Sequence, residues 1–331
     1  MIPIVYRFDD GNAPVHVGTA GSLVNLLEKC LVTGYGDKLP AGWTKDYANV
    51  ENTIAAFRNN PATGTGFFCL VTDTVGITAT VQGYESMTAI DVGVGPFHAS
   101  GLSFSKAPAA TPVKWMLIAT DTVFYLFTYR GCTTTTELNF FTMVNGTDNS
   151  RLQSLMFGDF IPESASTFNC VVGVGSSSER GDSVLSSWYW PHGHMSDAGV
   201  AGFWSPRPVS GLVGTPTSVL QIFAGGPLGY YYHAQYGLRE YGPDYVQNGE
   251  LIIAKPALCD GANSTEYRGV LQGLFKACHQ ALSFKALLDG VGFPVITTNG
   301  RSFVVVAHFG VYQGNYSSLT LLFELGVDWT L

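Results

Sequence analysis

The hydrophobic and polar positions of this chain change their spacing after residue 43. Before that point the apolar residues recur every three or four positions, which places them on one face of a helix. This apolar stripe has five members: Leu23, Leu26, Leu27, Cys30 and Leu31. Asn25, Glu28 and Lys29 fall off the stripe. The pattern predicts one amphipathic helix over residues 20–33.

Polar residues and glycines mark both ends of this helix. Thr19 or Ser22 can accept a hydrogen bond from the free amides of the first turn, and Gly34 stands where a left-handed capping residue is needed. Residues 34–43 then predict a turn. We expect five of its residues to be structural, since glycine alone tolerates positive φ freely: Gly34, Tyr35, Gly36, Gly42 and Trp43.

After residue 43 the chain consists of short apolar or alternating runs separated by Gly, Pro, Asn and Asp. Such runs predict β-strands, and two strongly apolar ones flank a compact turn at Asp121 and Thr122. The Gly- and Pro-rich segment 91–101 is predicted as a loop. The fold class that follows is mainly β, with two β-rich units, sandwich- or barrel-like, and one N-terminal amphipathic helix.

A polar segment around residues 161–167 contains Pro162 and is the best candidate for a domain boundary. The sequence therefore predicts an N-terminal β unit at 1–162, including the helix at 20–33, and a C-terminal β unit at 163–331. The second unit contains long loops rich in Gly, Pro and aromatic residues, at 191–216 and 226–245. Loops of this length are unusual unless they bind something or neighbouring chains order them.

The composition argues for burial among other chains. Only 13% of the residues are charged, about half the usual share, while 46% are hydrophobic. We therefore expect apolar surface that partner proteins cover. The net charge of −8 and the absence of Lys/Arg runs argue against nucleic-acid binding, and no apolar stretch is long enough to predict a membrane span or a signal peptide.

The candidate chemistry is weak. The six cysteines form no CxxC pair and are predicted to be reduced core thiols. His192 and His194, followed by Asp197, lack a visible third ligand for zinc, so no metal or cofactor is predicted. GxSxG is absent, and a glycosidase pair of carboxylates could only assemble in space. No residue is assigned as catalytic, and the chain is predicted not to be an enzyme.

Two aromatic groups are candidate glycan or interface residues. Aromatic faces pack on the apolar patches of sugar rings, but they also fill cores and protein interfaces, which is the interpretation we favour. The six residues are Trp188, Tyr189, Trp190, Tyr230, Tyr231 and Tyr232.

Two stretches resemble a family of structural proteins from tailed-bacteriophage particles. The first is GTAGSLVNLLEKCLVTGYGDKLPAGWTK at 18–45, followed by AAFRN, YESM and GPFHASG. The second is IIAKPALCDGANSTEYRGVLQGLFKACHQ at 252–280, followed by an apolar strand and Trp329. The segment GLFKACH departs from the family's usual pattern.

The resemblance implies a non-enzymatic virion component, assembled in the bacterial cytoplasm and belonging to the tail or baseplate. Its partners would be other virion proteins and copies of itself, without nucleic acid or membrane. Two alternatives are a carbohydrate-binding adhesin at the tail tip, contacting a host-surface glycan, and a decoration protein of the head. A third, an enzyme that degrades surface polysaccharide, would need the carboxylate pair.

Overall fold

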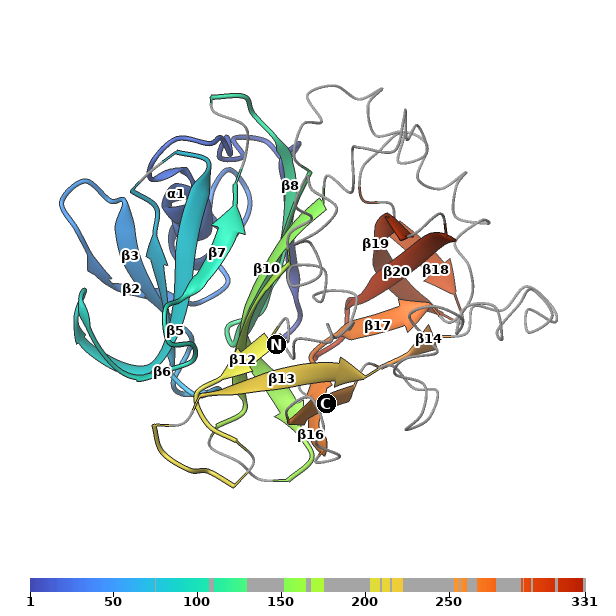
Figure 1. Cartoon of the computed structure of the whole chain (residues 1–331). Coiled ribbons are helices and arrows are strands. Elements are labelled where there is room, and N and C mark those ends of the chain that lie inside the picture. The colour runs from blue at the N-terminus through green and yellow to red at the C-terminus, as the bar shows by residue number, and fades with distance from the viewer. Residues whose placement is uncertain are drawn as a thin grey trace.

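The computed structural model describes most of the first half of the chain and separate segments of the second. The described residues are 1–74, 76–106, 110–129, 152–164, 168–175, 203–208, 210–214, 216–222, 253–255, 257–260, 267–277, 293, 295–298, 300–312 and 315–329. Among the described residues, 51% are in strands and 6% are helical. The chain is therefore mainly β, as the sequence predicts, and the strands of its described residues form three antiparallel sheets (Figure 1).

The first sheet has six strands and lies at the left of Figure 1. Its path runs β2-β3-β4-β5-β6, and β7 pairs with the other end of β5. The strands are β2 (Thr44–Ala48), β3 (Ile54–Arg58), β4 (Phe68–Thr72), β5 (Thr78–Ala89), β6 (Val92–Pro96) and β7 (Leu102–Ser105).

The central sheet has nine strands in the order β1-β8-β9-β10-β11-β12-β13-β15-β16. They are β1 (Ile4–Arg7), β8 (Lys114–Ala119), β9 (Val123–Tyr129), β10 (Leu152–Pro162), β11 (Cys170–Gly175), β12 (Phe203–Ser205), β13 (Thr217–Ile222), β15 (Ala257–Asp260) and β16 (Tyr267–Leu271). Strand β10 pairs with β9 up to Gly158 and with β16 from Phe160 onward. The pairing thus returns to β10 after passing through β11, β12, β13, β15 and β16.

The third sheet has five strands in the order β14-β17-β20-β19-β18 and lies at the right of Figure 1. They are β14 (Ile253–Ala254), β17 (Leu274–Ala277), β18 (Val295–Thr298), β19 (Arg301–Tyr312) and β20 (Asn315–Leu325). A tight turn at Gln272 and Gly273 connects β16 of the central sheet directly to β17.

Strands β8 and β9 are buried on both faces. One alternating set enters a core shared with the helix and the first sheet: Trp115, Leu117, Ala119, Phe124 and Leu126. The other set enters a second core shared with the third sheet: Met116, Ile118, Tyr125 and Phe127. Because successive strand residues point to opposite faces, such strands need apolar side chains at nearly every position, which explains the unbroken apolar runs in this part of the sequence.

The predicted helix is present and buries the predicted face. It comprises α1 (Ser22–Glu28) followed by a π-helical turn, η1 (Lys29–Thr33). All five stripe residues are fully buried, whereas Asn25 is exposed. The stripe belongs to the core between the first sheet and the central sheet.

The prediction that Thr19 or Ser22 caps the N-terminus of the helix is wrong. Ser22 turns its hydroxyl toward the preceding segment, where it accepts from Val17 N at 2.9 Å. The first-turn amide of Leu23 instead donates to Asp73 Oδ2 at 2.7 Å, from the residue that follows β4. A carboxylate from the first sheet therefore accepts a hydrogen bond from a free N–H of the first helical turn. Its negative charge also interacts favourably with the positive end of the helix dipole.

Two predicted loops contain strands. Segment 91–101 includes β6, which pairs with β5. Its Gly93 and Gly95 lie against the side chains of Tyr84 and Glu85, which leave no room for a Cβ. The segment 191–216 includes β12, which pairs with β11 and β13; residues 191–202 and the loop 226–245 lie outside the described residues. The division between 1–162 and 163–331 stays a prediction, and the central sheet takes strands from both sides of it.

Substituting Leu27 with Asp should destabilise the protein by more than about 4 kcal/mol, because it places an unpaired charge in the first core. Asn25→Asp is the matched control on the exposed side of α1 and should change the unfolding free energy by less than about 0.5 kcal/mol. Chemical denaturation measures both. Equal stability of the two variants would contradict the burial of the stripe.

Candidate functional site

The aromatic residues that the sequence suggests for glycan or interface contacts are outside the described part of the chain. These are Trp188, Tyr189, Trp190, Tyr230, Tyr231 and Tyr232, and His192, His194 and Asp197 lie outside it as well. Their predicted roles stay predictions, and the candidate site is built from other residues.

The glycine turn at 34–43 packs against the start of the chain and the central sheet. Gly34, Gly36 and Gly42 have φ angles of 75°, 51° and 96°. A Cβ on Gly36 would lie 2.4 Å from the carbonyl oxygen of Gly11, so a side chain cannot fit there. The buried Tyr35 donates from its hydroxyl to Asp10 at 2.8 Å.

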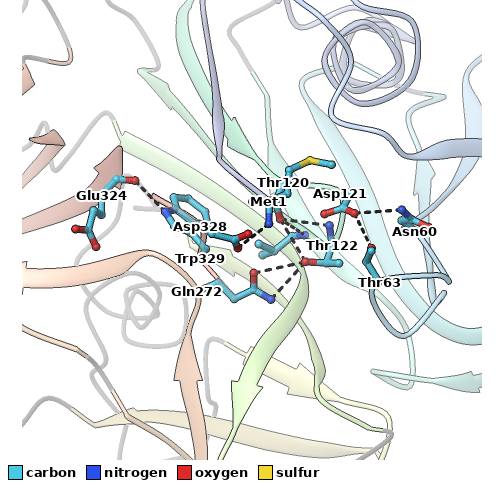
Figure 2. Close-up of polar contacts among 11 residues, drawn as sticks. Met1, Asn60, Thr63, Thr120, Asp121, Thr122, Gln272, Glu324, Asp328 and Trp329 are labelled. Carbon is cyan, nitrogen blue, oxygen red and sulfur yellow. Dashed lines mark hydrogen bonds and ion pairs between the residues drawn. The ribbon is translucent and has the colours of Figure 1, made fainter. Parts of the chain in front are cut away.

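Three turns from different sheets meet around the β8–β9 connection, and we call this region the junction. Its members are the β3–β4 turn (residues 59–65), the β8–β9 turn (residues 120–122) and the β16–β17 turn (residues 272–273). Figure 2 shows the polar contacts that join them. Thr120, Asp121 and Thr122 are at most 3% exposed, although turns normally lie at the surface.

The buried β8–β9 turn has its carbonyl groups satisfied by three distant parts of the chain. Trp43 Nε1 donates to Thr120 O at 2.8 Å. The backbone N–H of Asn60 donates to Asp121 O at 2.9 Å, and that of Asp159 donates to Thr122 O at 3.0 Å. Because a buried unpaired carbonyl is costly, these contacts are what allow the turn to be internal.

The carboxylate of Asp121 fixes the β3–β4 turn. It accepts from Thr63 Oγ1 at 2.6 Å and from Asn60 Nδ2 at 3.1 Å (Figure 2). The first sheet is thereby attached to the central sheet through side chains as well as through the apolar core.

Asp159 holds the same turn from β10. Its Oδ1 accepts from Asn59 Nδ2 at 3.0 Å and from Thr65 Oγ1 at 2.7 Å, and its Oδ2 accepts from Thr65 N at 2.8 Å. The side chain is 2% exposed. Burial raises the pKa of Asp159 from 3.8 to about 6, although the hydrogen bonds from Thr65 and Asn59 act in the opposite direction.

Gly158 allows this close approach of β10 to the β8–β9 turn. Its φ is 139°, and a Cβ there would lie 2.3 Å from Thr122 O. Only glycine therefore fits beside Asp159 at this point.

The β16–β17 turn closes the junction from the third sheet. Tyr125 donates from its hydroxyl to Gln272 O at 2.9 Å. The Gln272 side chain contacts the Thr122 hydroxyl at 3.4 Å through Nε2 and at 3.5 Å through Oε1. The Nε1 of Trp329 donates to Glu324 O at 2.9 Å (Figure 2). The indole of Trp329 covers Gly273, where it leaves no room for a Cβ.

A pocket of about 450 Å³ opens at the junction. Its floor includes Thr122, Asp159 and Gln272, which are almost completely buried. Its rim includes the more accessible side chains of Thr63, Thr65, Asn169, Ile161 and Pro162. The pocket thus has a polar floor and a rim of mixed character.

A second buried polar cluster lies at the start of α1. Lys106 pairs with Asp73, both side chains being fully buried, and its Nζ also donates to Thr19 O at 2.7 Å. His16 Nδ1 lies 3.2 Å from Ser22 Oγ. Burial, with a smaller contribution from Lys106, lowers the pKa of His16 to about 3, so the imidazole is neutral. These groups are enclosed, and their contacts hold the segments around α1 together.

The two clusters differ in what they can do chemically. The cluster at α1 is closed, whereas the junction presents hydroxyl, amide and carboxyl groups to an open pocket. Within the described residues no group of three or more His, Cys, Asp or Glu side chains could hold a metal ion. The junction is therefore suited to hydrogen-bonded recognition.

The sequence indicated the compact turn at Asp121 and Thr122 but not its burial. The available signal was a polar Thr-Asp-Thr segment between two strands that are apolar at nearly every position. Its partners Asn59 and Gln272 are 63 residues before and 150 residues after Thr122, too far for a local pattern to reveal.

No protein-family model matches this chain, and no curated protein shows significant similarity to it. Among the described residues, no helix has both the length and the apolar character needed to cross a membrane.

The raised pKa of Asp159 should make stability fall with increasing pH. The folded protein binds this proton more tightly than the unfolded chain, so the stabilisation is complete below pH 3.8 and is lost as the pH rises to about 6. The difference corresponds to about 3 kcal/mol.

The measurement compares wild type with Asp159→Asn by urea denaturation at several pH values. Other titrating groups, including His16, contribute equally to both proteins and cancel in the difference. We expect the advantage of wild type over the variant to shrink by about 2 kcal/mol between pH 4 and pH 7, most of the full difference. An advantage that grows over this range would show that Asp159 has a lowered pKa.

Proposed function

We propose that this chain is a non-enzymatic structural component of a tailed-bacteriophage particle, belonging to its tail or baseplate. It acts through interfaces with other virion proteins and with copies of itself. The resemblance of residues 18–45 and 252–280 to such proteins supports the proposal, as does the low proportion of charged residues, 13%. The structural observation that carries it is an unprotected apolar strand at the edge of the first sheet.

Strand β6 forms this edge, and among the described residues no strand pairs with its outer side. Its sequence is Val-Gly-Val-Gly-Pro, and Val92 and Val94 are 49% and 60% exposed. An uncharged edge with exposed valines readily accepts another strand, which is why isolated proteins usually protect such edges. Pro96, at the end of the strand, limits pairing there, and Gly95 beside it has a φ of 64°.

The opposite edge of the same sheet is protected by charge. Strand β2 carries Lys45 and Asp46. Lys45 pairs with Glu28 at 2.7 Å, and Asp46 lies 3.9 Å from Arg58. Charged side chains along an edge disfavour pairing with another chain. The contrast between β2 and β6 supports the proposal that β6 is the side at which this sheet meets a partner.

A second apolar segment is attached close to β6. Leu212 and Val213, in the β12–β13 connection, are 61% and 69% exposed. Earlier in this connection Arg207 binds Glu85 of β5 through two contacts, at 2.5 and 2.7 Å. The same carboxylate packs against Gly95 of β6. Both apolar segments thus lie at the same end of the molecule (Figure 1).

Purified particles of the phage that encodes this sequence provide the direct test. Mass spectrometry should find the chain in intact particles, and its amount should follow that of tail proteins when tails are separated from heads. Its absence from particles would refute the proposal, and its recovery with heads alone would contradict the assignment to tail or baseplate.

The edge itself can be tested with the isolated protein. Wild type should self-associate at moderate salt, and the double substitution Val92→Lys with Val94→Lys should reduce its average mass toward that of the monomer, because two charges now occupy the edge. Light scattering measures this.

Val50→Lys is the matched control, since Val50 is 99% exposed at the β2–β3 turn. Its mass distribution should equal that of wild type. A monomeric wild type, or an equal effect of Val50→Lys, would contradict the role of β6.

A further inference from the structure

We propose that the junction pocket binds a neutral hydroxylated ligand, namely one ring of a saccharide. This inference goes beyond a structural role in a particle and does not depend on it. It rests on the volume of the pocket, on the hydrogen-bonding groups that its floor leaves available, and on the charges of its lining.

The pocket has the size of a small-molecule site. Its volume of about 450 Å³ falls within the range of about 300–1,000 Å³ that is usual for such sites. The floor residues Thr122 and Gln272 are 2% and 4% exposed, so their polar groups lie at the buried end of the pocket. The rim is contributed by β10, by the β3–β4 turn and by Asn169.

The floor has hydrogen-bonding capacity that the protein does not fully use. Within the described part of the chain, the Gln272 side chain makes two hydrogen-bond contacts, both with the Thr122 hydroxyl and both 3.4 Å or longer. The Thr122 hydroxyl donates to Oε1 and accepts from Nε2, but contacts of this length are weak. An amide that is 4% exposed is therefore poorly satisfied, and a ligand hydroxyl would satisfy it.

The rim adds acceptors around this amide. Asn169 donates from Nδ2 to Phe160 O at 3.1 Å, which orients its side chain and leaves Oδ1 as an acceptor. Thr65 Oγ1 and Thr63 Oγ1 donate to Asp159 and Asp121, so their remaining lone pairs can accept from a ligand. Donors and acceptors together match hydroxyl groups, each of which both donates and accepts.

The charges of the lining exclude an anionic ligand. Among the described residues that line the pocket there is no Lys, Arg or His, and Asp159 is the one ionisable side chain. A phosphate, sulfate or carboxylate would have to enter beside this carboxylate without a cation to stabilise it. A hydroxylated ring without charge meets no such penalty.

The remaining wall is apolar and the floor is rigid. Ile161 and Pro162 present aliphatic surface on which the C–H groups of a ring can pack. Asp159 is held by three hydrogen bonds, and a Cβ on Gly64 would lie 2.5 Å from its Oδ2. The β3–β4 turn therefore packs tightly against Asp159 in the absence of a ligand. Pre-organisation of this kind lowers the entropic cost of binding.

The test uses the full chain and a panel of free sugars. Glucose, galactose, mannose and N-acetylglucosamine are titrated by saturation-transfer NMR and calorimetry, with glucuronate as the anionic counterpart of glucose. We expect saturable binding of at least one neutral sugar, and binding of glucuronate at least tenfold weaker than that of glucose or not measurable.

Two substitutions locate the site. Gln272→Met keeps the volume of the side chain but removes the amide, and should weaken binding about tenfold. Asn169→Ala removes a rim acceptor and should weaken binding severalfold. Thr297→Val removes an exposed hydroxyl on β18, outside the pocket, and should leave affinity unchanged. Thermal melting establishes that each variant is folded. If Gln272→Met does not fold, the affinity of Asn169→Ala decides whether the ligand binds in the pocket.

Four results would overturn the proposal. They are the absence of saturable binding by every neutral sugar, equal affinity for glucuronate and glucose, unchanged affinity in folded Gln272→Met and Asn169→Ala proteins, and equal loss of binding in Thr297→Val.

Discussion

The two-sided burial of β8 and β9 is the constraint on which the rest of the structure depends. These strands separate a core that contains α1 from a core that contains the third sheet, so they have no face in contact with water. The turn that joins them is then internal too, and its carbonyl groups need partners inside the protein. Trp43, Asn60 and Asp159 provide those partners, and each comes from a different part of the chain.

The junction follows from this requirement. The side chains that satisfy the buried turn also bring the β3–β4 turn and the β16–β17 turn together, because Asp121 and Asp159 reach the first and Thr122 reaches the second. A polar pocket therefore lies where the β3–β4, β8–β9 and β16–β17 turns meet. Most of its floor is satisfied by the protein itself, and Gln272 is the floor residue with the weakest internal contacts.

Local patterns in the sequence predicted the elements well and their partners poorly. The spacing of Leu23, Leu26 and Leu27 predicted the buried face of α1, and the apolar runs predicted β8, β9 and the turn between them. The cap of α1 was missed because Asp73 is 50 residues away from Leu23. Strand β6 was missed because its glycines are typical of loops. In the structure these glycines are needed because the side chains of Tyr84 and Glu85 cover them and leave no room for a Cβ. The contact between Asn59 and Asp159 spans 100 residues, and no periodicity reports it.

The register of the central sheet also determines the order in which the chain can fold during its synthesis. Strand β1 pairs Ile4 with Ala119, and β10 pairs Phe160 with Leu271, so each ladder joins segments more than one hundred positions apart. The first sheet, in contrast, is made entirely from residues 44–105 and needs only short connections. During synthesis on the ribosome the first sheet can therefore form early. Strand β1 can pair only after β8 has been synthesised, and the end of β10 from Phe160 onward can pair only after β16 has been synthesised.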